Sequence, residues 1–224
     1  KSANDLTAFR DLTNKAAGKN ASAVLCNDID MSTVTNWKTP IGNSLAYEGV
    51  FDGNGYSIKN LKYKPTQQAN QGRALFGKIS EKAIIRNLGI SGAKITAKSP
   101  QADSNIAVLA GNNSGYIYNC YVIDSEVSIK TKSAPNIGVL CSVNNGKIEN
   151  CYCINSTIKD ASTKTTSGVY GGIAGANTGT VKNSYAVSIT FSIYEKNTIT
   201  PHPISSSNTE NVYYSKATGD ARIY

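Results

Sequence analysis

Apolar residues along this chain occur in short bursts, in which they alternate with polar or small residues until a turn interrupts them. The segment NIAVLAGNNSGYIYNC, residues 105–120, shows the pattern: an apolar burst, a polar turn, and a second burst that ends near Asn119. Alternation with a period of two is typical of β-strands, whereas an amphipathic helix needs a longer period. Gly and Asn accept the positive φ of tight turns. The pattern therefore predicts an all-β chain of short strands joined by regular turns.

One seven-residue phrase recurs in the second half of the chain. IYNCYVI, IENCYCI and VKNSYAV begin at Ile117, Ile148 and Val181, and each places Asn third and Tyr fifth. Related asparagines extend the phrase at intervals of about 30 residues, which gives the series Asn60, Asn87, Asn119, Asn150, Asn183 and Asn211. A repeat of short strands and turns cannot bury its apolar side alone, so neighbouring repeats must stack.

The series predicts a single-stranded parallel β-helix, a solenoid of about six coils. We expect it to be right-handed, because parallel crossover connections almost always are. We also expect the asparagines to be structural, with inward side chains that bond the turn backbone and the equivalent Asn about 4.8 Å away in the next coil.

Residues 1–18 are expected to form a helix that caps the solenoid, because stacked sheets expose open edges at their ends. Ser2 and Asp5 resemble the start of a capping box, residues 3–17 have helical apolar spacing, and Gly18 suits the C-terminal end. The apolar face is predicted to comprise Leu6, Phe9, Leu12 and Ala16, and to lie near Val24, Leu25 and Ile29.

The coils are expected to fill residues 19–224, so that residues 1–224 form one domain. Since no initiator Met or signal-peptide segment is present, we expect a fragment of a larger surface protein whose export signal lies outside it.

Four of the five cysteines fall at repeat positions that other coils fill with apolar or small residues. Cys120 and Cys151 align with Leu88 and Ser184, while Cys141 and Cys153 align with positions held by Ala, Ile and Val. We therefore expect buried free thiols that act as small hydrophobes.

The order of these motifs resembles the GLUG repeat of bacterial surface proteins. The resemblance rests on IAVLAGNNSGYIYNCYV, IGVLCSVNNGKIENCYC and GGIAGANTGTVKNSYAV, and on the preceding segment WKTPIGNSLAYEGVFDGNGYSIKNL. It covers nearly the whole chain and implies a β-helix, an extracellular location and a role in adhesion or display. Ser142 departs from the pattern, because Gly111 and Gly175 hold that place in the neighbouring repeats.

Catalytic chemistry has little support in the sequence. The only histidine, His202, lies between two prolines in an expected loop, which argues against a Ser/His/Asp triad. Asp28, Asp30 and Asp52 are the best carboxylate cluster for cleavage of a polysaccharide, but their positions also suit turn capping. We expect no cofactor and no metal site.

The surface carries the candidate binding residues. The residue two after each Asn should face outward, which predicts a tyrosine stripe of Tyr118, Tyr121, Tyr152, Tyr185 and Tyr213, flanked by Lys59, Arg86 and Lys182. Loops leaving the coils add the basic residues Lys98, Lys130, Lys132 and Lys164 to a chain with a net charge of +8. Simple packing between coils and protection of strand edges explain the same residues without a ligand.

The sequence therefore predicts a secreted or surface-displayed bacterial binding module that is adhesin-like and not an enzyme. Its expected partners are host, dietary or mucin glycans, or another surface protein. Scarce arginine and the lack of a recognition motif argue against nucleic acid, and no apolar run is long enough to insert into a membrane. An inert stalk is the alternative function, and a polysaccharide lyase or hydrolase is the third.

Overall fold

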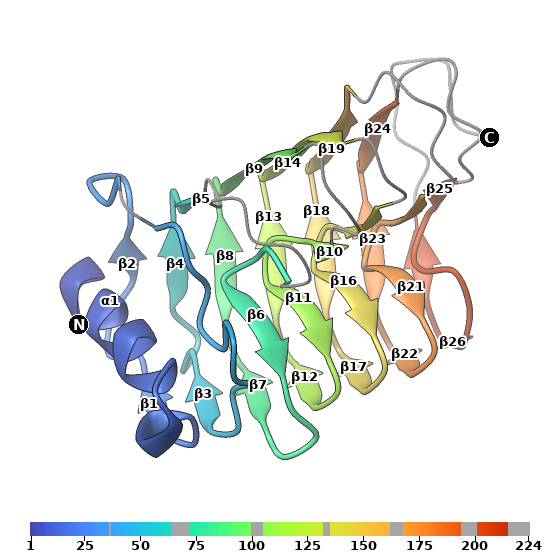
Figure 1. Cartoon of the computed structure of the whole chain (residues 1–224). Helices are drawn as coiled ribbons and strands as arrows, with labels where there is room; N and C mark the ends of the chain where they lie inside the picture. Colours follow the sequence, from blue (N-terminus) through green and yellow to red (C-terminus); the bar gives the residue numbers. More distant parts are fainter. Residues whose placement is uncertain are drawn as a thin grey trace.

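The chain folds into a parallel β-solenoid of about five turns with one α-helix at its N-terminal end (Figure 1). The computed structural model describes residues 1–35, 37–63, 72–99, 105–131, 135–161, 168–193 and 201–214. The predicted all-β solenoid and its N-terminal helix are confirmed. The turn count is slightly below the predicted six, because the first and last turns contribute strands to only some of the sheets.

The strands form five parallel sheets, named I to V in the order in which one coil passes through them. Sheet I contains β1 (Ala23–Val24), β3 (Val50–Asp52), β7 (Ile84–Arg86), β12 (Tyr116–Tyr118), β17 (Lys147–Glu149), β22 (Thr180–Lys182) and β26 (Thr209–Glu210). Sheet II contains β2 (Ile29–Asp30), β4 (Ser57–Lys59), β8 (Gly89–Ser91), β13 (Tyr121–Ile123), β18 (Tyr152–Ile154), β23 (Tyr185–Val187) and β27 (Tyr213–Tyr214).

The other three sheets complete each coil. Sheet III contains β5 (Lys62–Tyr63), β9 (Lys94–Ser99), β14 (Glu126–Thr131), β19 (Thr157–Asp160) and β24 (Thr190–Ile193). Sheet IV contains β10 (Asn105–Ile106), β15 (Asn136–Gly138), β20 (Val169–Gly171) and β25 (Pro201–His202). Sheet V contains β6 (Phe76–Ile79), β11 (Ala110–Asn113), β16 (Cys141–Asn144) and β21 (Ala174–Asn177).

Asparagine makes the sharp corner between sheets I and II. Asn87, Asn119, Asn150, Asn183 and Asn211 all have φ between 48° and 53°, the left-handed region that Asn enters more readily than most residues. Their side chains face outward, not inward as the sequence suggested. Outward amides still bond from coil to coil: Asn119 Nδ2 donates to Asn87 Oδ1 at 3.3 Å, and Asn211 Nδ2 donates to Asn183 Oδ1 at 3.2 Å.

Asn60 does not belong to this series, which corrects the sequence alignment. Lys59 pairs with Ser91, so Asn60 lies at the corner between sheets II and III, beside Gly92. In that coil Gly53 follows Asp52, the partner of Arg86, and therefore occupies the place that Asn87 holds in the next coil. An extra turn over residues 53–56 shifts the Asn by one corner.

A different set of asparagines lines the interior. Asn113, Asn144 and Asn177 are buried at the ends of β11, β16 and β21. Asn113 Nδ2 donates to Asn144 Oδ1 at 2.7 Å, and Asn144 Nδ2 donates to Asn177 Oδ1 at 2.8 Å. Each amide thus finds its partner in the next coil, as buried polar groups require.

The remaining interior is mostly apolar and includes four thiols. Cys120, Cys141, Cys151 and Cys153 are buried and unpaired, as expected, whereas Cys26 is exposed. Burial raises the pKa of Cys120, Cys141 and Cys153, which keeps these thiols protonated and unreactive. Ser142, the departure from the repeat pattern, is also buried, and its hydroxyl donates to the Asn136 carbonyl at 2.6 Å.

Helix α1 (Ala3–Thr13) covers the first coil and is followed by the short 3₁₀ turn η1 (Ala16–Gly18). The predicted capping box is present, with Asp5 N donating to Ser2 Oγ at 3.2 Å and Ser2 N donating to Asp5 Oδ2 at 3.0 Å. The helix ends earlier than predicted, at Thr13, and its C-cap is Asn14 rather than Gly18. Leu6 is buried, but Leu12 is 48% exposed, so the apolar face is narrower than expected. Leu25 and Ile29 are buried beneath this end of the solenoid, whereas Val24 is exposed.

Candidate functional site

The outer face of sheet II is aromatic and aliphatic. Alternation along β13, β18 and β23 turns Val122, Cys153 and Ala186 inward and their neighbours outward. One outward row is Tyr121, Tyr152 and Tyr185, and the parallel row is Ile123, Ile154 and Val187. We call these six residues the aromatic face.

The three tyrosine rings stack on one another. Ring centroids of Tyr121 and Tyr152 are 5.1 Å apart with planes inclined by 7°, and Tyr152 and Tyr185 are 5.1 Å apart with planes inclined by 5°. Parallel rings at this separation are offset-stacked, which is a favourable aromatic geometry. The rings therefore present their edges and hydroxyl groups outward, with only part of each ring face free.

The coil that precedes Tyr121 has a glycine where the tyrosine ring lies. Gly89 pairs with Tyr121, and a Cβ at Gly89 would lie 2.1 Å from Cζ of that tyrosine. At the other end Tyr213 pairs with Tyr185 and is 72% exposed, compared with 37% for Tyr185. The tyrosine row thus begins on a glycine and becomes more exposed toward the C-terminal end of the solenoid.

The aromatic face is uncharged at neutral pH. Burial raises the pKa of Tyr152, and the neighbouring phenols of Tyr121 and Tyr185 raise it further. A phenol already titrates far above neutrality, so this shift keeps the hydroxyl protonated and able to donate a hydrogen bond.

Tyr118 lies on a different face from the other predicted tyrosines, because the corner at Asn119 separates β12 from β13. Its row runs along sheet I through Asp52, Arg86, Tyr118, Glu149, Lys182 and Glu210. Arg86 Nη1 donates to the Tyr118 hydroxyl at 3.1 Å, and the ion pairs Arg86–Asp52 and Lys182–Glu210 measure 2.7 Å and 3.0 Å. This outer row of sheet I is therefore charged, and its members bond to one another.

The predicted basic residues are only partly placed. Lys98 and Lys130 are paired positions of β9 and β14 in sheet III, and the Lys130 side chain is exposed. Lys132 and Lys164 lie outside the described residues. Lys59 was expected at the outer position of Tyr118, but it lies in β4 of sheet II, in the row that continues through Ser91 to Ile123. It forms a 2.6 Å ion pair with Asp28.

The three candidate catalytic carboxylates are each held by neighbours. Asp28 also accepts from Ser57 N at 2.8 Å, and Lys59 together with Ser57 lowers its pKa to about 2. Asp30 accepts from Asn60 Nδ2 at 2.9 Å, and Asp52 accepts from Arg86 Nε at 2.7 Å. Their hydrogen bonds are those of turn caps and ion pairs, and none of them has the raised pKa of a general acid.

Three expectations remain, for His202, for a metal site and for a membrane-spanning segment. His202 lies in the short strand β25 of sheet IV rather than in a loop. Among the described residues, no group of three or more His, Cys, Asp and Glu side chains is arranged to hold a metal ion. No helix in the described ranges has the length and hydropathy of a membrane-spanning segment.

Two curated proteins share part of this sequence, and no family model matches it. The chain is 33% identical over 124 residues to a "Putative Gly-rich membrane protein" of Evansella cellulosilytica, an alignment that covers 53% of this chain and 14% of that protein. It is 27% identical over 124 residues to "Halomucin" of Haloquadratum walsbyi, covering 48% of this chain and 1% of that protein. The chain thus spans a small fraction of the length of both relatives.

A solved structure shares the fold. The chain matches a crystal structure described as "a putative immunoglobulin A1 protease from Bacteroides ovatus" with a TM-score of 0.68 and 22% identity. The match covers 95% of this chain and 73% of the other. At this identity the likeness establishes the solenoid architecture and leaves function to the residues on its surface.

Proposed function

We propose that this chain is a non-catalytic, adhesin-like binding module displayed at a microbial cell surface, and that its aromatic face contacts extended glycans. The observation that carries the proposal is the outward row of parallel tyrosines on sheet II, spaced 5.1 Å apart. The shared sequence with a long protein named as a membrane protein supports display at the surface. The alignment with Halomucin covers 1% of that protein, which supports the proposal that the chain is a part of a much longer protein.

The aromatic face suits a sugar chain better than the neighbouring faces do. Sugars offer apolar C–H surfaces together with hydroxyl groups, and a surface of aliphatic side chains with phenol hydroxyls matches both. Sheet I instead carries ion pairs along one of its two outer rows, and a neutral ligand would have to disrupt them. Because the same contact repeats in three successive coils, a ligand with a repeating structure gains several weak contacts at once.

Tyrosine is not required for the solenoid to close at this position. Ser57 and Gly89 occupy the equivalent place in two earlier coils of sheet II. The change from small residues to three stacked rings is therefore a local feature of the later coils. This restriction to one stretch of one face supports the proposal that the stretch binds a ligand.

An inert stalk is the second candidate, and the ring stacking itself favours it. Each stacked pair stabilises adjacent coils by about 0.5–1.5 kcal/mol beyond the burial of its area. If the rings serve only this purpose, their loss lowers stability and changes no ligand binding.

A glycan array separates the two candidates. The chain and the triple variant Tyr121→Thr/Tyr152→Thr/Tyr185→Thr are applied to plant polysaccharides and mucin glycans, with the variant Tyr116→Thr/Tyr118→Thr as a matched control on sheet I. Threonine suits an outward strand position, so the variants are designed to fold, and circular dichroism checks this. We expect binding to extended glycans that the triple variant loses and the control keeps. Absence of binding by the folded wild-type chain would favour the stalk.

A further inference from the structure

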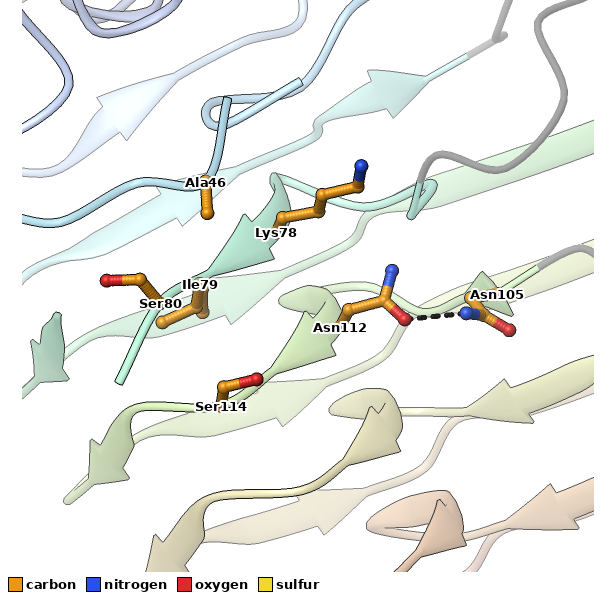
Figure 2. Close-up of a pocket in the computed structure, with 7 residues that line it drawn as sticks. All are labelled: Ala46, Lys78, Ile79, Ser80, Asn105, Asn112 and Ser114. Atoms are coloured by element: carbon orange, nitrogen blue, oxygen red, sulfur yellow. Dashed lines mark hydrogen bonds between the residues drawn. The ribbon is translucent and has the colours of Figure 1, made fainter. Parts of the chain in front are cut away.

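A second candidate site lies on the opposite part of the coil, over sheet V. It is a shallow depression of about 340 Å³ lined by Ala46, Lys78, Ser80, Asn105, Asn112 and Ser114 (Figure 2). Lys78 in β6 and Asn112 in β11 are paired positions of adjacent coils. Lys78 and Asn112 come from sheet V and Asn105 from sheet IV, while Ala46, Ser80 and Ser114 lie in segments outside the strands. No residue of the aromatic face lines this depression.

Three side-chain amides form a series of hydrogen bonds that leads to the depression. Asn136 Nδ2 donates to Asn105 Oδ1 at 3.1 Å, and Asn105 Nδ2 donates to Asn112 Oδ1 at 2.6 Å. The amide dipoles are aligned, and successive hydrogen bonds of this kind polarise one another. This series of hydrogen bonds ends at the Asn112 NH₂ group, which has no acceptor among the described residues. The series of amide bonds thus leaves the half-buried Asn112 NH₂ group as a donor that is open to a ligand in the depression.

The Lys78 ammonium adds a positive charge beside that donor. Figure 2 shows the Lys78 Nζ and the Asn112 Nδ2 pointing to the same side of sheet V. Lys19, Lys59, Lys159 and Lys182 each form an ion pair, but in the described part of the chain Lys78 forms none. Among the described residues, no carboxylate lines the depression. Two adjacent donors without an acceptor favour an anionic ligand.

The size and the other lining groups point to a sugar that carries the anion. A volume of about 340 Å³ is at the lower end of the range for small-molecule sites. The Ser80 and Ser114 hydroxyls can bond to sugar hydroxyl groups, and the Ala46 methyl offers a small apolar contact. We propose that this depression binds a sugar bearing a single carboxylate or sulfate group, with the anion on Lys78 Nζ and Asn112 Nδ2.

The solenoid supplies its own safe substitution for a test. The row that contains Lys78 and Asn112 continues as Val143 and Ala176 in the next two coils. An apolar residue at this position is therefore compatible with the fold. Asn112→Val copies the neighbouring coil and removes the terminal donor, and Lys78→Gln removes the charge. Lys147→Gln is the control, because Lys147 is an exposed lysine on sheet I.

Calorimetric or NMR titration with glucuronate, N-acetylneuraminate and glucose 6-sulfate tests the proposal, with methyl glucoside as the neutral probe and acetate and sulfate as bare anions. Weak binding of the charged sugars is expected at millimolar concentration. Lys78→Gln and Asn112→Val should each weaken it by about tenfold, since hydrogen bonds to charged groups contribute this much. Added salt should weaken it further.

Three results would overturn the proposal: no binding of any charged sugar up to about 10 mM, equal binding of methyl glucoside, or an equal loss in Lys147→Gln. Bare anions that bind as tightly as the charged sugars would remove the sugar from the assignment. The site is independent of the aromatic face, so the tyrosine variants should leave this binding unchanged. Failure of one proposal is therefore distinguishable from failure of the other.

Discussion

The substitution Asn144→Ala is the strictest test of the buried asparagines Asn113, Asn144 and Asn177, whose amides bond from coil to coil. Asn144 is fully buried at the end of β16, and its amide lies between those of two neighbouring coils. It accepts from Asn113 Nδ2 at 2.7 Å and donates to Asn177 Oδ1 at 2.8 Å and to the Thr180 carbonyl at 3.1 Å.

The expected loss of stability follows from the partners left behind. In Asn144→Ala, the side-chain oxygen Asn177 Oδ1 and the backbone carbonyl of Thr180 each lose a donor. Asn113 Nδ2 keeps only its longer bond to the backbone carbonyl of Lys147, at 3.3 Å. A buried polar group without a partner costs about 1–3 kcal/mol. With the small cavity added, we expect a loss of about 3–5 kcal/mol, or a melting temperature lower by about 10 °C or more.

Urea denaturation followed by circular dichroism measures this loss. Asn145→Ala is the matched control, because Asn145 is the next residue, is exposed, and accepts one bond from Thr178 Oγ1 at 2.7 Å. The control should lose about 1 kcal/mol or less. If Asn144→Ala loses no more than Asn145→Ala, the buried amides do not hold adjacent coils together and the reasoning is refuted.

Four further predictions address the corners, the thiols, the charges and the rings. Asn150→Gly should leave the unfolding free energy nearly unchanged, whereas Asn150→Ala should lose about 1 kcal/mol because alanine is strained at the corner φ of 53°; equal losses in urea denaturation would contradict this. A thiol reagent should label Cys26 alone among the five cysteines of the native chain and all five after denaturation, and rapid native labelling of more than one would show that the core opens. The pKa of Asp28 is lowered by Lys59, so its stabilisation is complete above the ordinary carboxyl pKa and is lost as the pH falls toward 2; thermal melts of Asp28→Asn should depend less on pH in this range than wild type. Tyr152→Thr should lose about 1–3 kcal/mol, because it removes a ring stacked on both sides, and a loss near zero in the same urea assay would show that the rings contribute nothing to stability.

The solenoid was predictable because its corners restrict the residue types. A left-handed φ favours Asn or Gly at a fixed place in every coil, so the period is visible as Asn87, Asn119, Asn150 and Asn183. Alignment with Leu88 and Ser184 in neighbouring coils then assigned Cys120 and Cys151 to the interior correctly, because equivalent positions of stacked repeats share one environment. The capping box at Ser2 is likewise a local motif with a fixed spacing.

The errors arose where the chain turns between two strands. Parity counted from Asn119 assigned Tyr118 and Tyr121 to one outer surface, but the corner lies between them and places them on different sheets. An extra turn moved Asn60 to the other corner for the same reason. Nor does composition distinguish the buried Asn113 from the exposed Asn119, because only the path of the turn decides which amide faces inward. The depression over sheet V is lined by residues that are far apart in the sequence, so no single sequence motif predicts it.

Aromatic NMR spectra of the tyrosines during titration with a glycan test the central claim most directly. The probes are soluble hexasaccharides of cellulose and chitin, and released mucin glycans. The account predicts that the ring signals of Tyr121, Tyr152 and Tyr185 shift together with at least one of these probes, while Tyr116 and Tyr118 on sheet I do not respond. Unchanged signals from all three stacked rings, or equal shifts on both sheets, would contradict a glycan-binding role for the aromatic face.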